Sequence, residues 1–140
     1  MANPGPATTV TNHPSNLATN QAIRLLASYP GVNVNATGDT VLPMLNTGSY
    51  SVSKVIFTNA STSLTTAVAG VFTAPSAGGT GIVANAALSA LTGSTVVSQR
   101  TVASTAAQTG QNLYVNVGTA QGAAATMDVF VYGYDLTFLP

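Results

Sequence analysis

The sequence contains no cysteine, no tryptophan and no glutamate, and its only histidine is His13. Without cysteine the chain can form no disulfide, and it gives no indication of a redox compartment. The usual zinc sites are excluded because they are built from cysteine and histidine. One histidine also leaves little material for a catalytic triad, and no Gly-x-Ser-x-Gly sequence supports one. We therefore expect no enzyme, no metal site and no cofactor.

Charged residues are scarce as well. They make up 4 % of the sequence, against roughly 25 % in an average protein. The net charge is zero, and the scattered basic residues cannot provide the positive surface that nucleic-acid binding needs. Molecules with so few charges repel one another only weakly, and we therefore expect the protein to self-associate. The complete set of charged residues is Arg24, Lys54, Arg100, Asp39, Asp128 and Asp135.

Long apolar runs are absent as well. Nothing approaches the ~18 consecutive apolar residues of a membrane helix, so we expect no membrane partner. The N-terminal stretch lacks the basic and apolar segments of a signal peptide, which indicates synthesis in a cytoplasm. The apolar fraction of 46 % over 140 residues fits a single domain with a hydrophobic core.

Residues 1–16 stand apart from the rest by their proline content. Proline lacks an N–H and restricts its predecessor, so this segment cannot propagate a helix or a central strand. It is either a disordered tail or an extended arm that lies on a neighbouring subunit. In the second interpretation, the residues that contact the partner are Pro4, Pro6, Val10, His13 and Pro14.

Residues 17–140 form the predicted domain, and their first segment is ambiguous. The apolar spacing over Leu17–Tyr29 slightly favours a helix, which Pro30 and Gly31 would end. A strand through Ala22–Ala27 is the alternative. One short helix is therefore part of the prediction.

From Gly31 onward the pattern is that of short strands separated by Gly, Ser, Thr and Asn. Tyr50–Thr58 and Thr66–Ala74, joined by a polar loop, suggest a hairpin. Pro43 places its strand at a sheet edge or a bulge, and Asn85–Leu91 reads as a helical turn or irregular. The predicted fold is mainly β, a single jelly-roll-like β-sandwich of about seven or eight strands. The other predicted strands are Val32–Val34, Thr40–Leu45, Thr80–Ala84, Thr95–Val102, Asn112–Thr119 and Thr126–Phe138.

The last predicted strand, Thr126–Phe138, carries apolar residues on both faces, which indicates cover by the core and by a partner. It also contains Asp128 and Asp135, seven residues apart and thus on opposite faces. They cannot form a paired-carboxylate site. A buried carboxylate would need a cation, and Lys54 and Arg100 are the candidate ion-pair partners.

Two segments resemble small virion proteins of tailed bacteriophages. They are Ser49–Phe72, which reads SYSVSKVIFTNASTSLTTAVAGVF and is followed by Gly78 and Gly79, and Gln121–Gly133, which reads QGAAATMDVFVYG. The resemblance spans residues 40–134. It lies in the general character of the sequence and in the order of its segments, and it includes no catalytic motif.

The resemblance implies a head decoration, or cement, protein of the capsid surface. Its expected partners are further copies of itself, as a homotrimer, and a major capsid protein, and its expected location is the virion after synthesis in the host cytoplasm. The alternative is a tail or fibre module that binds a host-surface glycan. A small cell-surface adhesion domain is a third interpretation.

Overall fold

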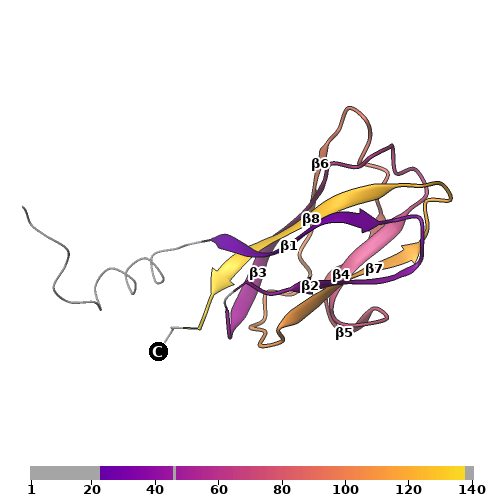
Figure 1. Cartoon of the computed structure of the whole chain (residues 1–140). Coiled ribbons are helices and arrows are strands. Elements are labelled where there is room, and N and C mark those ends of the chain that lie inside the picture. The colour runs from indigo at the N-terminus through magenta and orange to yellow at the C-terminus, as the bar shows by residue number, and fades with distance from the viewer. Residues whose placement is uncertain (1–22, 46, 138–140) are drawn as a thin grey trace, which may run out of the picture.

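The computed structural model describes residues 23–45 and 47–137, and within these ranges the chain is built from strands alone (Figure 1). The prediction of a mainly β chain is therefore confirmed. The strands are β1 (Arg24–Asn33), β2 (Gly38–Pro43), β3 (Tyr50–Thr58), β4 (Val68–Ala74), β5 (Gly78–Ala87), β6 (Val97–Arg100), β7 (Asn112–Thr119) and β8 (Thr126–Asp135).

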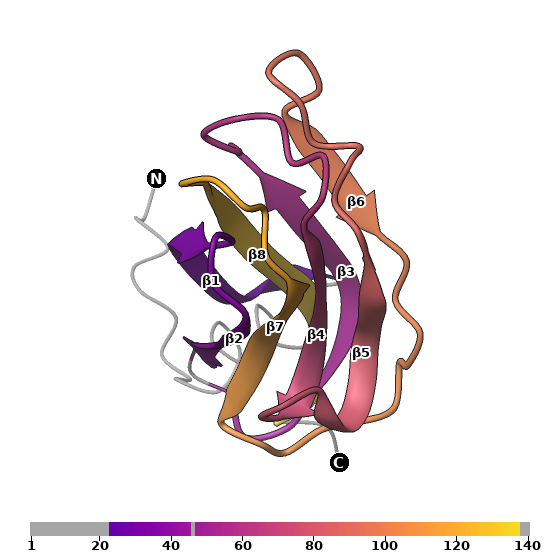
Figure 2. The ribbon, with the colours of Figure 1, turned by 90° about the vertical axis from the view of Figure 1, so that its right-hand side faces the viewer.

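The strands form two four-stranded antiparallel sheets, in the orders β1-β8-β3-β6 and β2-β7-β4-β5. Figure 2 shows the two layers facing each other. Only β4 and β5 are consecutive strands of one sheet, and every other connection carries the chain to the opposite layer. This is the strand order of a jelly roll, so the predicted β-sandwich is confirmed.

The suggested hairpin between Tyr50–Thr58 and Thr66–Ala74 is wrong. The strand β3 lies between β8 and β6, whereas β4 lies between β7 and β5 in the other sheet. The linker is not a tight turn, because Leu64 and Ala67 within it are fully buried. Its apolar side chains close one end of the core, so the chain crosses the sandwich instead of folding back on the same sheet.

The slightly favoured helix over Leu17–Tyr29 is also wrong where the structure describes it, because residues 24–33 form β1. Residues 17–22 lie outside the described residues. The register of β1 against β8 shifts between Leu25 and Ala27, so the consecutive residues Leu26 and Ala27 are both buried. Such a bulge breaks the two-residue alternation of a strand and imitates helical spacing.

The prolines of the first two strands fit edge positions. Both β1 and β2 are edge strands, so Pro30 and Pro43 remove no hydrogen bond from the interior of a sheet. The edge placement predicted for Pro43 is confirmed. Pro30 and Gly31 do not end an element, because they fall in the second register irregularity of β1.

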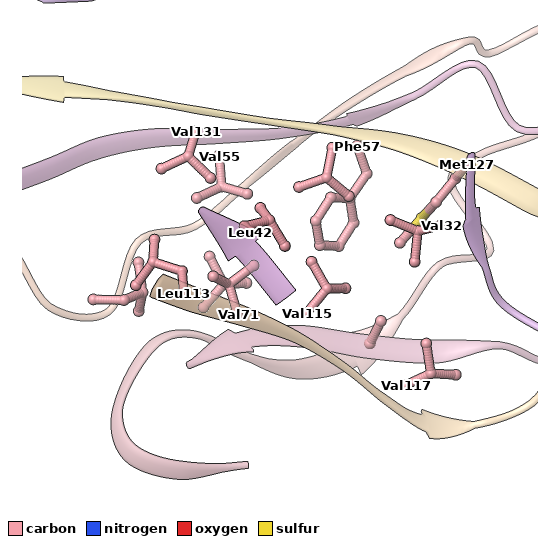
Figure 3. Packing of buried hydrophobic residues seen from close by; sticks show 14 of the residues in the cluster. Val32, Leu42, Val55, Phe57, Val71, Leu113, Val115, Val117, Met127 and Val131 are labelled. Carbon is pink, nitrogen blue, oxygen red and sulfur yellow. The ribbon is translucent and has the colours of Figure 1, made fainter. Parts of the chain in front are cut away.

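The core lies between the two sheets and is almost wholly aliphatic. Val55 and Phe57 from one sheet face Leu113 and Val115 from the other, all without exposed surface (Figure 3). Burial of each such side chain contributes about 1.5–3 kcal/mol. Among the described residues no buried side-chain nitrogen or oxygen lacks a hydrogen-bond partner.

Gly133 of β8 lies too close to the backbone of β3 to carry a side chain. A Cβ atom at this position would collide with the carbonyl oxygen of Ser51, the Cα of Val52 and the Cδ1 of Leu26. Two of these atoms belong to backbone next to the register shift between Val52 and Lys54. The backbone cannot withdraw without breaking the β3–β8 ladder, so the position requires glycine.

We expect Gly133→Ala to lower the free energy of unfolding by about 1–3 kcal/mol, the usual cost of overpacking. Chemical denaturation of the purified protein measures this. Gly93→Ala is the matched control, because a Cβ there has no atom within 4 Å, and it should leave stability unchanged or slightly raised. Equal midpoints for the two variants would contradict the packing argument.

Candidate functional site

Residues 23–45 and 47–137 contain no group of three or more histidine, cysteine or acidic residues placed to hold a metal ion. Over the same ranges, no helix has the length and apolar character needed to cross a membrane. The features that can carry function are therefore the sheet surfaces, the few charged groups and a cleft at one edge of the sandwich.

Among the described residues, Asp135 forms an ion pair with Arg24. The Nη2 of Arg24 lies 2.9 Å from the Oδ2 of Asp135, with 21 % and 13 % of the two side chains exposed. The register explains the choice, because Arg24 at the start of β1 pairs with Gly133 near the end of β8. The sequence had pointed to Lys54 and Arg100 as cations for this carboxylate, and neither forms an ion pair with it.

Hydrogen bonds set the acidity of Asp135. Partial burial raises its pKa, but bonds from Thr137, Thr47 and Arg24 outweigh that effect and lower the pKa from 3.8 to about 2. Thr47 donates its hydroxyl to Oδ1 at 2.8 Å, and the amide of Thr137 donates to the same oxygen at 3.0 Å. The cluster ties the end of β8 to the segment between β2 and β3.

We expect Asp135 to stabilise the fold by roughly 1–2 kcal/mol at neutral pH. Its folded pKa is depressed, so this contribution is complete above the unfolded pKa and is lost as the pH falls from about 4 toward about 2. The difference in free energy of unfolding between wild type and Asp135→Asn, measured by denaturation at several pH values, should shrink over that interval. A difference that does not change with pH would refute this assignment.

The other two carboxylates accept hydrogen bonds from neutral groups. Asp128 accepts the amide of Gly31 at 2.8 Å and the side-chain amide of Asn59 at 2.9 Å, so it joins β1 to the end of β3. Asp39 accepts the amide of Ser76 at 2.7 Å, at the turn between β4 and β5, and the side-chain amide of Asn116 at 2.9 Å. All three acidic side chains of the sequence thus form hydrogen bonds that join separate segments of the fold.

Lys54 and Arg100 occupy two different environments. Lys54 is half-buried on the outer side of β3, opposite Tyr132 of β8. Arg100 lies at the end of β6, and the Cζ of its guanidinium is over the ring of Phe57, 5.5 Å from the centroid, in a cation–π contact. Among the described residues neither cation forms an ion pair.

The outer side of the sheet β1-β8-β3-β6 is apolar and aromatic. Register and alternating burial place five side chains on it, and we call them the aromatic face. Four are half-buried, and Tyr134 is 42 % exposed. The sequence predicted that the core covers one side of the last strand and a partner the other, and the cover by a partner stays a prediction. The aromatic face consists of Leu25, Ile56, Phe130, Tyr132 and Tyr134.

The outer side of the sheet β2-β7-β4-β5 is different. A chain of amide hydrogen bonds crosses it, from Asn85 on β5 to Asn116 on β7 at 3.1 Å and from Asn116 to Asp39 on β2. Tyr114 and Phe72 pair in the adjacent row. We call Asp39, Asn116 and Asn85 the amide row.

Sequence reasoning found only part of the amide row. Within Asn112–Thr119 the sequence alternates Leu113, Val115 and Val117 with Tyr114, Asn116 and Gly118. This alternation predicts that the last three share one face, as they do in β7. The segment Asn85–Leu91 had been read as a helical turn or irregular, but residues 85–87 continue β5. No local signal identifies Asn85, because only the pairing of β4 with both β5 and β7 brings it to Asn116.

A cleft opens at the edge of the sandwich formed by β5 and β6, with a volume of about 340 Å³. Arg100 is its charged residue. The rest of its lining is small or neutral: Val83, Ala84, Ala86, Gln99, Thr101 and Ala103.

The predicted arm contacts Pro4, Pro6, Val10, His13 and Pro14 lie outside the described residues. Comparison of the chain with models of protein families, with curated proteins and with solved structures found no match. The surfaces described above are therefore the basis for a functional assignment.

Proposed function

We propose that the protein is a non-enzymatic structural component of a virion, a decoration protein that binds the outer surface of a phage capsid. The observation that carries the proposal is the aromatic face. Five apolar or aromatic side chains from three adjacent strands form one surface, and no other part of the described chain covers it completely. Burial of such a surface against another protein is strongly favourable.

The scarcity of charge supports the same proposal. Interfaces between proteins are depleted in charged residues at their centres and enriched in tyrosine and phenylalanine. The aromatic face contains Phe130, Tyr132 and Tyr134, with Lys54 beside them. A chain with 4 % charged residues has little electrostatic barrier to close packing of many copies.

The fold agrees with this role by analogy only. Eight-stranded jelly rolls occur in viral capsid proteins and in lectins, and one fold serves many functions. In the proposed assembly the aromatic face packs between copies of a homotrimer, and a second surface contacts the major capsid protein. The protein would be made in the host cytoplasm and would function in the virion.

Imaging of assembled particles tests the assignment. We expect many copies of the chain spread over the faces of the capsid. A few copies confined to the tail would support the alternative module instead, and particles without the chain would refute both.

The double substitution Tyr132→Gln and Tyr134→Gln should abolish self-association and weaken particle binding at least tenfold, because buried aromatic side chains dominate interface energies. Mass measurement in solution and cosedimentation with particles stripped of the protein provide the readouts. Tyr114→Gln on the opposite sheet is the matched control and should retain both properties. An unchanged oligomer in the double variant would remove the basis of the proposal.

Removal of residues 2–16 tests the proposed arm. We expect the free energy of unfolding to stay the same, because β1 begins at Arg24, and binding to stripped particles to weaken. Denaturation and cosedimentation of the same preparation measure the two effects. Particle binding as tight as that of the full chain would contradict the arm.

A glycan-binding tail or fibre module is the second candidate, and the amide row favours it. Sugars are bound by hydrogen bonds to amides and carboxylates beside an aromatic ring, and Asn116 and Asp39 lie in the row next to Tyr114. A glycan array separates the candidates. Saturable binding that Tyr114→Gln removes would favour this module over the decoration protein.

A further inference from the structure

The cleft between β5 and β6 lies at the side of the sandwich away from β1 and β2, where each sheet ends in an edge strand. Three alanines and a valine line much of it, and Arg100 brings the charge. Among residues 23–45 and 47–137 no other basic residue lines this cleft, because Lys54 lies on the outer side of β3 and Arg24 is paired with Asp135 at the end of β8.

The guanidinium of Arg100 is held in place from two sides. Its Cζ lies over the ring of Phe57, a fully buried core residue, at 5.5 Å from the centroid. Its Nη1 donates a hydrogen bond to the carbonyl oxygen of Ala87 at 3.2 Å, which anchors β6 to the end of β5. Such a fixed guanidinium loses little side-chain entropy when it binds a ligand.

Part of the same guanidinium remains available. Its Nε and Nη2 have no acceptor among residues 23–45 and 47–137, and no unbonded side-chain nitrogen there is fully buried. Two donors in the plane of a guanidinium match the two oxygens of a carboxylate. Burial lowers the pKa of Arg100, because desolvation disfavours its charged form, and an anion at this site would offset that cost.

The chain supplies no acidic side chain for this position. The sequence has only Asp39, Asp128 and Asp135. The first two are bonded to amides elsewhere, and the third is paired with Arg24. A half-buried arginine that faces a cleft without an acidic side chain from its own chain is complementary to an anion from outside.

We propose that the cleft between β5 and β6 is a binding site for one carboxylate group, which Arg100 receives through its open guanidinium edge. A carboxylate fits better than a phosphate because the cleft contains one cation and is otherwise neutral. The alanines accommodate the short aliphatic stem of the ligand in about 340 Å³. The carboxylate comes from a free small acid or from an acidic side chain of a partner protein. The site does not depend on the proposed function.

Nuclear magnetic resonance of the isotope-labelled full chain tests the site. Sodium butyrate and a five-residue peptide with a central glutamate should each cause saturable shifts of the Arg100 Nε–H signal and of the Ala84 and Ala103 amides. Sodium chloride at equal ionic strength and the matching glutamine peptide should not. Absence of saturation with both carboxylates, or tighter binding of inorganic phosphate, would overturn the proposal.

Two variants and one control sharpen the result. Arg100→Gln should weaken carboxylate binding about tenfold to a hundredfold, the loss expected for hydrogen bonds to a charged group. Arg100→Lys keeps the charge but lacks the planar pair of donors, so its affinity for the carboxylate should lie between those of wild type and Arg100→Gln. It is the test variant if Arg100→Gln does not fold. Lys54→Gln should bind as wild type does. Undiminished binding by folded Arg100→Gln, or by Arg100→Lys if it alone folds, would refute the assignment.

The source of the carboxylate follows from the two probes. Tighter binding of the glutamate peptide than of butyrate would assign the site to an acidic segment of a partner protein, because the residues on either side of the glutamate add contacts outside the cleft. Equal affinity would assign it to small carboxylic acids. Both outcomes support the carboxylate site.

Discussion

The structure depends on the burial of two inner sheet faces against each other. Neither sheet has helices to cover it, so each must supply the apolar layer that removes the other from water. The chain changes sheet at every connection but one, so each layer is assembled from segments spread along the sequence. The same burial accounts for Leu64 and Ala67, which join the core from the crossing after β3.

With so few charges, the placement of each one matters. The three carboxylates all act as internal ties: Asp135 to Arg24, Asp128 to the bulged part of β1, and Asp39 to the β4–β5 turn. Each tie joins segments that are distant in sequence, and hydrogen bonds satisfy the buried polar groups. This distribution leaves Lys54 and Arg100 without an acidic partner among the described residues, and both lie on surfaces that can contact other molecules.

The two sheets present different outer surfaces. One carries the aromatic face and the other the amide row, while the edge between β5 and β6 carries the cleft with Arg100. An apolar surface favours a protein partner, whereas a row of amides beside a tyrosine favours a polar ligand. The jelly roll thus places three chemically different surfaces on separate parts of the molecule.

Local pattern predicted the β class, the edge position of Pro43, and the bounds of Tyr50–Thr58 and Asn112–Thr119, because alternating burial leaves a two-residue period in the sequence. It misread β1, where a bulge places Leu26 and Ala27 side by side in the core. Strand order, the Arg24–Asp135 pair, the amide row and the cleft were decided by tertiary structure alone. Each joins strands that are far apart in the chain, and no local propensity specifies which strands become neighbours.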